Sequence, residues 1–280
     1  MRRFDYTNDA HGNTQCSVFD SLVDMTATCE AIPAERSAIG AQSIDDSDFI
    51  GREFANVGEA FAAMHTVWAE GIQIVERMTR ELDSADLPKP VSRKRKPRFD
   101  ETDGDELDYD RLRTGQPFWR TTRRQNTRGP ATITVVVDVC ANCSVKAKDI
   151  LWRGAAAVAL TKRLEEAGYR VELWAAAYSL ENYHSTSGFV AVCLKRPSEP
   201  LDESTLVNAV SGWGFRSLWF QASCLGERPI KGNLGRARTP GKQELDQITP
   251  DANRVLIADA FTYESAVAKV RQAIQTITSK

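Results

Sequence analysis

The sequence is poor in histidine and cysteine and has no long apolar run. Three of its 280 residues are histidine and six are cysteine. Cysteines so few and so scattered in a chain of this length do not form a disulfide framework, and we expect them to be reduced. No apolar stretch approaches the roughly 18 residues that a membrane span requires, and Met1 to Asp5 lack the apolar region of a signal peptide. These absences predict a cytoplasmic protein with no membrane partner.

The signatures of common enzyme classes are missing as well. There is no Gly-x-Ser-x-Gly elbow, so the sequence offers no serine nucleophile of that kind for which His11, His65 or His184 could act as the base. Neither a Gly-x-x-x-x-Gly-Lys phosphate loop nor a strand-linked Gly-x-Gly-x-x-Gly motif occurs. What is present, 42% hydrophobic and 26% charged residues, is the composition of an ordinary globular protein.

The formal net charge of −2 conceals an uneven distribution of charge along the chain. Residues 1–88 carry 6 basic and 16 acidic side chains, residues 89–128 carry 12 basic and 7 acidic, and the remainder carries 18 basic and 15 acidic. The middle stretch combines prolines with few apolar residues, which is typical of a surface connection. We therefore predict an acidic extension over 1–88, a charged connection over 89–130 and a domain over 131–280.

The extension is predicted to be helical. Residues 17–30 indicate a short helix. From Glu53 to Asp83, apolar residues recur at three- and four-residue steps, which places them on one face of a helix. Gly71 costs that helix about 1 kcal/mol relative to alanine, so the segment forms one helix or two. We expect the apolar face to be buried against the main domain, and a partner's groove is the alternative.

From Thr132 onward, strand and helix patterns alternate. Ile133 to Val137 is a β-branched run that suits a strand buried on both faces. The helix after it is stopped by Gly168, and the next strand completes a βαβ unit whose strands should be parallel. The predicted elements are strands over 133–137, 170–178, 189–194 and 254–258 and helices over 148–166, 202–210 and 263–277. The alternation predicts a three-layer α/β/α, Rossmann-like, mostly parallel sheet with the helical extension packed against it.

Two aspartates follow predicted strands at the positions where an open parallel sheet binds its ligands. Asp138 ends the first strand and Asp259 follows the last, and Asn142 and Ser144 lie a few residues beyond Asp138. Carboxylate, amide and hydroxyl oxygens are ligands for a hard ion such as Mg²⁺. The alternative is that each aspartate caps a helix or loop through backbone N–H groups. For Asp138 both interpretations stay open, and for Asp259 we favour the cap.

The order of elements from about Thr132 to Ile277 resembles the von Willebrand factor A family. The helix that contains Arg153-Gly154-Ala155-Ala156-Ala157 and the strand entry at Gly168-Tyr169-Arg170-Val171-Glu172 carry the same resemblance. The sequence is also similar to a largely bacteriophage-encoded family with this core, in which a segment like Gly104 to Arg111 precedes it. The resemblance implies an A-like α/β fold whose carboxyl-end loops dock proteins.

The resemblance also implies a metal site, and the residues here depart from it. The family's site begins Asp-x-Ser-x-Ser, and the corresponding residues are Asp138, Cys140 and Asn142. Only the aspartate is retained, and sulfur is a poor ligand for Mg²⁺. We therefore expect a degenerate metal site.

Cys140-Ala141-Asn142-Cys143 is a C-x-x-C sequence between a strand and a helix, which is the setting of thioredoxin-like redox motifs. A helix N-terminus would lower the pKa of such a thiol. A zinc site would need two further ligands with supporting spacing, and Cys193 and Cys224 stand alone. Cys140 and Cys143 are therefore the redox candidates.

The basic connection offers charges for phosphates and flat rings for base stacking. The nucleic-acid candidates are Arg93, Lys94, Arg95, Lys96, Arg98, Trp119, Arg120, Arg123 and Arg124. The alternative is that these arginines pair with the acidic extension or remain solvated.

These observations favour a non-catalytic binding or assembly module that docks a protein partner through the carboxyl-end loops of an A-like sheet. The expected partner is another protein, or the chain forms a homo-oligomer. The first alternative is a nucleic-acid-binding protein that uses residues 93–128. The second is a metal-dependent or thiol enzyme at Asp138, Cys140 and Cys143. No cofactor is expected, and Mg²⁺ is the one candidate.

Overall fold

The computed structural model describes most of the chain and divides it into two compact units. The larger unit combines Met1–Pro88 with Thr132–Lys280, and the smaller one is Lys89–Ala131. Each unit has a sheet of its own. The described residues are 1–8, 12–32, 47–52, 54, 57–82, 98–121, 132–180, 186–225, 236–249 and 253–278.

The larger unit is built on a mixed seven-stranded sheet with the order β1-β2-β8-β7-β6-β10, and β9 pairs with β7 off this path. β6 pairs in parallel with β7 and β10, and β2 pairs in parallel with β8. β1–β2, β7–β8 and β7–β9 are antiparallel pairs. The strands are β1 (Arg2–Asn8), β2 (Gly12–Phe19), β6 (Thr132–Asp138), β7 (Arg170–Leu180), β8 (Thr186–Lys195), β9 (Arg236–Arg238) and β10 (Arg254–Ile257). The predicted parallel βαβ unit is confirmed by β6, α6 and β7.

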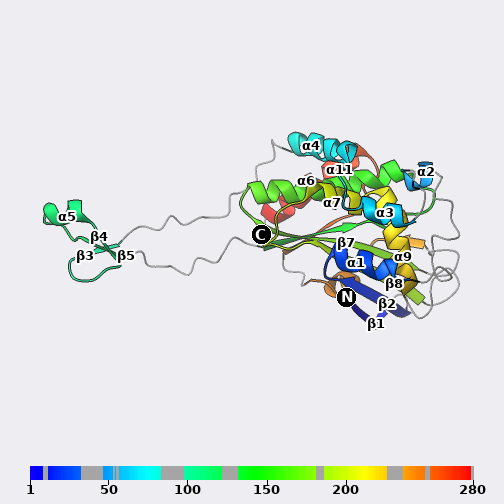
Figure 1. The fold of residues 1–280 in the computed structure, drawn as a ribbon, viewed down its shortest axis with the longest axis horizontal. Helices are drawn as coiled ribbons and strands as arrows, with labels where there is room; N and C mark the ends of the chain where they lie inside the picture. Colours follow the sequence, from blue (N-terminus) through cyan, green and yellow to red (C-terminus); the bar gives the residue numbers. More distant parts are fainter. Residues whose placement is uncertain are drawn as a thin grey trace. The chain divides into compact units, whose positions relative to one another are not determined.

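All described helices of eight or more residues lie on one side of this sheet. They share a core with Val135 and Val137 of β6. Figure 1 shows α6 and α11 over that side, with α4 beyond α6. These helices are α1 (Leu22–Glu30), α4 (Ala69–Glu81), α6 (Ala147–Glu166) and α11 (Tyr263–Thr278). The shorter ones in the same core region are α2 (Ser47–Ile50), α3 (Val57–Ala63), α7 (Glu203–Ala209), α8 (Gly212–Gly214), the π-helix η2 (Phe215–Trp219), α9 (Phe220–Ala222) and η3 (Ser223–Leu225).

The opposite face of the sheet carries a single short helix among the described residues. Its core includes Val136, Trp174 and Phe189, and α10 (Lys242–Asp246) adds Leu245. The α/β class is therefore confirmed, but helices are not shared evenly between two faces as a three-layer arrangement would have them. The strands are apolar on both faces, which shows that both faces are covered but not which element covers each.

The first strands of the sheet come from a segment that was predicted to be a helical extension. Residues 12–19 form β2, which joins β8 in register, so the predicted helix over 17–30 begins only at Leu22. The Ser21 side chain caps it by accepting the N–H of Asp24 at 3.1 Å. Polar residues within β2 break its apolar alternation, which is why the strand was missed.

The predicted helix over 53–83 is two helices. α3 and α4 are separated by residues 64–68, so the break precedes Gly71. A Cβ on Gly71 would lie 2.5 Å from the Trp68 ring, so this glycine makes room for the indole. The buried side chains of α4 belong to the main core, as expected for burial against the domain.

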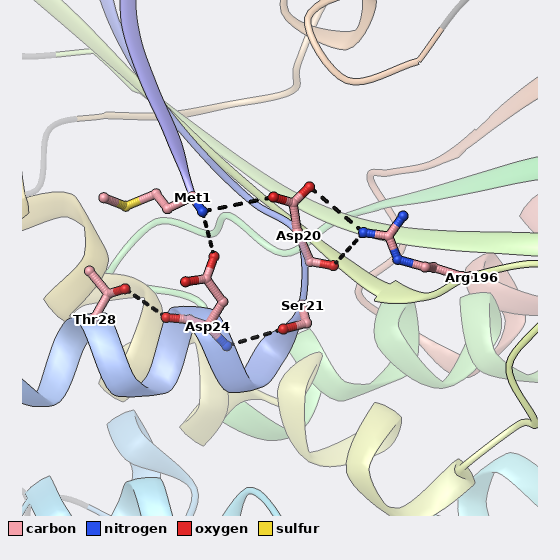
Figure 2. A network of polar contacts seen from close by, with 6 residues as sticks. All are labelled: Met1, Asp20, Ser21, Asp24, Thr28 and Arg196. Carbon is pink, nitrogen blue, oxygen red and sulfur yellow. Dashed lines mark hydrogen bonds and ion pairs between the residues drawn. The ribbon is translucent and has the colours of Figure 1, made fainter.

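A polar network fixes the start of β1 against α1 (Figure 2). The Met1 ammonium lies 2.8 Å from Oδ2 of Asp24 and 3.8 Å from Oδ2 of Asp20. Nη2 of Arg196, which follows β8, lies 3.7 Å from Oδ1 of Asp20. The hydrogen bond to Asp24 is the main reason that the pKa of the Met1 ammonium is raised. The residue just before β1 is thus held in place, where an edge strand would otherwise fray.

The smaller unit contains regular structure where a plain connection was predicted. Three short antiparallel strands in the order β3-β5-β4 accompany one helix. Arg111 lies over the Phe99 ring at 3.9 Å and donates from Nε to the Pro117 carbonyl at 2.9 Å. None of the residues 98–121 is fully buried. The elements are β3 (Arg98–Asp100), β4 (Glu106–Leu107), α5 (Tyr109–Arg113) and β5 (Trp119–Thr121).

Candidate functional site

The carboxyl ends of the parallel strands β6 and β10 define the candidate site. The chain leaves β6 at Asp138, and Asp259 lies two residues beyond the end of β10. β9 pairs with residues 178–180 of β7, next to the point where β6 ends. Chain directions therefore bring the two predicted aspartates to one edge of the sheet, where open α/β sheets bind their ligands.

Both oxygens of Asp138 are engaged by the protein itself. Oδ1 accepts the backbone N–H of Cys140 at 2.9 Å, and Oδ2 accepts from Nη1 of Arg153 at 3.2 Å. The Asp138 and Arg153 side chains are 3% and 1% exposed. Burial raises the pKa of the Asp138 carboxyl to about 6, against the opposing effects of Arg153 and of the Cys140 N–H. Asp138 is thus a buried ion-pair partner that also holds the loop after its own strand.

Arg153 links this loop to the loop after β10. Its Nη2 donates to the Cys140 carbonyl at 2.8 Å, and its guanidinium lies 5.0 Å from the centroid of the Phe261 ring. Helix α6 positions it, since Gly154 beside it lets the helix approach Val210 closely. The sequence contains one signal that Arg153 is buried. This arginine stands directly before Gly154 and a run of alanines, on a helix that packs against the sheet.

The two candidate redox cysteines lie in different environments. Cys140 is buried, and burial and the charge of Asp138 raise the pKa of its thiol to about 12. Cys143 is exposed, and both are free thiols. Helix α6 begins only at Ala147, so Cys140 is not at a helix N-terminus that would lower its pKa. A thiol with a pKa of about 12 stays protonated at neutral pH and is a poor nucleophile.

The remaining candidate metal ligands face solvent. Asn142, Ser144 and Asp259 are exposed. Asp259 adopts a left-handed backbone conformation with φ 52°, and its Oδ1 lies 3.4 Å from the Thr239 hydroxyl. Among the described residues, no three His, Cys, Asp or Glu side chains are placed to hold a metal ion. With Asp138 already paired to a guanidinium and a buried thiol at position 140, this donor set does not fit Mg²⁺.

A second buried arginine fixes the loop after β6 from behind. Arg216 is 1% exposed and sits in the π-helix η2. Its guanidinium donates to the carbonyls of Phe49, Asn142 and Val145 and lies 3.9 Å from the Phe49 ring centroid. Sequence reasoning missed Arg216, because nothing in its local pattern marks an arginine that is buried by distant segments.

The nucleic-acid candidates are only partly within the described residues. Arg98 is exposed, Trp119 is half-buried opposite Leu107 of β4, and Arg120 forms an ion pair with Glu106 at 3.6 Å. The other candidates, Arg93, Lys94, Arg95, Lys96, Arg123 and Arg124, lie outside the described residues.

The fold and this edge define an α/β protein in which a parallel strand, β6, ends in a buried aspartate–arginine pair. The chain belongs to the family described as a domain of unknown function, DUF7192, whose model matches residues 7–278. No curated protein and no solved structure matches the chain. None of the described helices is both long and apolar enough to cross a membrane.

Proposed function

We propose that this protein is a non-catalytic binding or assembly module with a von Willebrand A-like sheet, and that its carboxyl-end loops dock a protein partner. The pairing of Asp138 with Arg153 carries the proposal. It commits the one retained carboxylate of the site to holding the loops, which leaves it unavailable to a substrate or a metal. A reaction at Asp138, Cys140 and Cys143 has less support for the same reason.

The loops themselves have the character of a docking surface. Their exposed side chains are polar, while Arg153 and Arg216 hold the loop after β6 through its backbone carbonyls. A loop fixed in this way loses little conformational entropy when a partner binds. Asn142, Ser144 and Asp259 are the exposed residues that would make the first contacts.

Cys143 allows a direct test, because it is the exposed thiol among the described cysteines. In a Cys224→Ser background, a photoreactive maleimide is attached to Cys143 of the full chain. It should cross-link the chain to a protein in an extract of the cells that express it. Adding Ser144→Arg, which crowds the loop without removing a described contact, should reduce the yield of that cross-link several-fold.

The matched control moves the photoreactive group to α11. Gln272→Cys in a background of Cys143→Ser and Cys224→Ser places it on an exposed helix position. Equal cross-linking from both positions, or a yield that Ser144→Arg leaves unchanged, would contradict docking through the loops.

Nucleic-acid binding remains the second candidate because of how charge is divided in the smaller unit. The described part, residues 98–121, carries 4 basic and 7 acidic side chains, whereas the flanks 89–97 and 122–131 carry 8 basic and no acidic ones. Phosphate binding would therefore rest on the flanks, with Tyr109, 70% exposed, as an available ring for stacking.

A further inference from the structure

The free edge of β1 is well formed for pairing with another strand. β1 borders the main sheet and pairs only with β2 among the described strands. Its seven residues include no proline, and its register with β2 runs from Arg2 to Asn8 without a shift. Edge strands are usually protected from pairing by proline, bulges or charged side chains, lysine above all. β1 has no proline, bulge or lysine, and its exposed charges are of both signs, so they can complement the charges of a second copy.

The side chains of β1 alternate in a self-complementary way. Phe4 and Tyr6 are half-buried and pack on the core of one face of the sheet. Arg3 and Asp5 point to the other face, where both are exposed. Among the described residues, neither forms an ion pair. The edge thus presents one positive and one negative charge, two residues apart, on the same face.

We propose that β1 is a homodimerisation edge, in which the β1 strands of two copies pair antiparallel with Phe4 opposite Phe4. In this register Arg3 of each copy lies directly opposite Asp5 of the other, and Arg2 lies opposite Tyr6. Two opposite-charge pairs form across the twofold axis, and such directly opposed pairs stabilise antiparallel strands. The contact uses the same patch on both copies and closes on itself, as a dimer with twofold symmetry requires.

β1 is anchored just before its first residue and again at Tyr6, so little ordering is left for association to impose. Met1 is held by Asp24 at the start, and the Tyr6 hydroxyl donates to Oε1 of Glu244 at 2.7 Å towards the end. Glu244 is itself fixed, since Oε2 accepts the N–H of Gly241 at 2.7 Å. Preorganisation of this kind lowers the cost of binding. An interface of two seven-residue strands is nevertheless small, so we expect a dimer that dissociates on dilution.

Charge reversal tests the register. The full chain is examined by sedimentation velocity over a range of concentrations. Arg3→Asp and Asp5→Arg each place like charges opposite one another in a homodimer, and each should weaken association by at least about tenfold. In an equimolar mixture of the two variants, both cross-strand positions again hold opposite charges. The mixture should therefore dimerise as the wild type does, and so should the double variant Arg3→Asp/Asp5→Arg.

The controls reverse charge at exposed positions away from the edge. Arg271→Asp and Glu264→Arg on α11 make the same changes in net charge and should leave association unchanged. Matching urea midpoints confirm that each variant is folded. A wild type that stays monomeric at every concentration, a mixture that does not recover the dimer, or controls that weaken it equally would overturn the proposal. Loop docking is tested separately, because Ser144→Arg should leave this dimer intact.

Discussion

At the scale of single residues, the buried charges of this protein hold backbone segments in position. Asp138 and Arg153 are removed from water as a pair, and the cost of removing two charges from water can exceed their attraction. The pair fixes the loop after β6, because Asp138 accepts the N–H of Cys140 and Arg153 donates to its carbonyl. Lys195 follows the same pattern: its ammonium lies 2.5 Å from Glu165 and donates to two carbonyls.

The raised pKa of Asp138 makes stability depend on pH. Because burial raises this pKa to about 6 in the folded chain from 3.8, the folded state binds more protons than the unfolded state between those values. Stability therefore falls as pH rises through this interval. Relative to Asp138→Asn, which lacks the titration, the wild type should lose on the order of 2 kcal/mol of unfolding free energy between pH 4 and about 6.5.

Urea unfolding of both chains across this interval measures the effect, since other titrating groups contribute equally to both curves. Parallel curves for the wild type and Asp138→Asn would show that Asp138 titrates in the folded chain as it does in the unfolded one.

Among the elements, α6 determines the geometry of the site. It is the twenty-residue crossover between β6 and β7, and it carries Arg153 to the edge. Its approach to the segment after α7 is very close, since a Cβ on Gly154 would lie 2.4 Å from Cγ2 of Val210 and 2.5 Å from the Val210 carbonyl oxygen. The glycine therefore sets both the packing of the helix and the reach of the arginine beside it.

Gly154→Ala should destabilise the protein even though alanine is the better helix former. The gain of about 1 kcal/mol in helix propensity is outweighed by crowding against Val210, whose backbone cannot yield easily, for a net loss of roughly 1–2 kcal/mol. Lys148→Ala on the exposed side of α6 is the control and should be nearly neutral. Thermal and urea unfolding distinguish the two, and a Gly154→Ala variant at least as stable as the wild type would contradict the close packing.

At the scale of the whole molecule, the small net charge is the sum of two units of opposite sign. The larger unit has a net charge of −7 and the smaller unit one of +5. The basic character of the smaller unit comes from its flanks, because residues 98–121 are acidic overall. Its compactness as a separate unit means that the larger unit should not need it to fold.

Replacing residues 89–131 by a glycine–serine linker should leave the larger unit folded. Its circular dichroism spectrum should be that of an α/β fold, and its urea midpoint should match that of the larger unit in the full chain. The same variant decides the nucleic-acid candidate. If the flanks bind phosphates, the full chain should bind single-stranded DNA with an affinity that falls steeply with salt, and the excised variant should lose that binding. Salt-dependent binding that survives the excision would place the contact elsewhere.

Local pattern alone identified the parallel β6–α6–β7 unit of the sheet. The β-branched run of β6, the helix that ends before Gly168 and the return along β7 are each encoded by neighbouring residues, and the position of Asp138 at a strand end follows from them. The C-terminal strand and helix, predicted over 254–258 and 263–277, are confirmed by β10 and α11. The helices α6 and α11 are long, and β6 and β10 are apolar runs, so tertiary contacts did not need to override their preferences.

Tertiary structure decided the N-terminal strands, the division of helices between the two faces and the partner of Asp138. β2 pairs with β8, which lies far away in the sequence: Thr14 and Ser187, which are in contact, are 173 residues apart. Arg153 meets Asp138 because the βαβ crossover folds α6 back over β6. The alternation of side chains along a strand specifies which faces are buried, but it carries no information about which distant segment will cover them. For that reason the sequence indicated an edge where a ligand could bind, and only the folded chain showed an arginine already there.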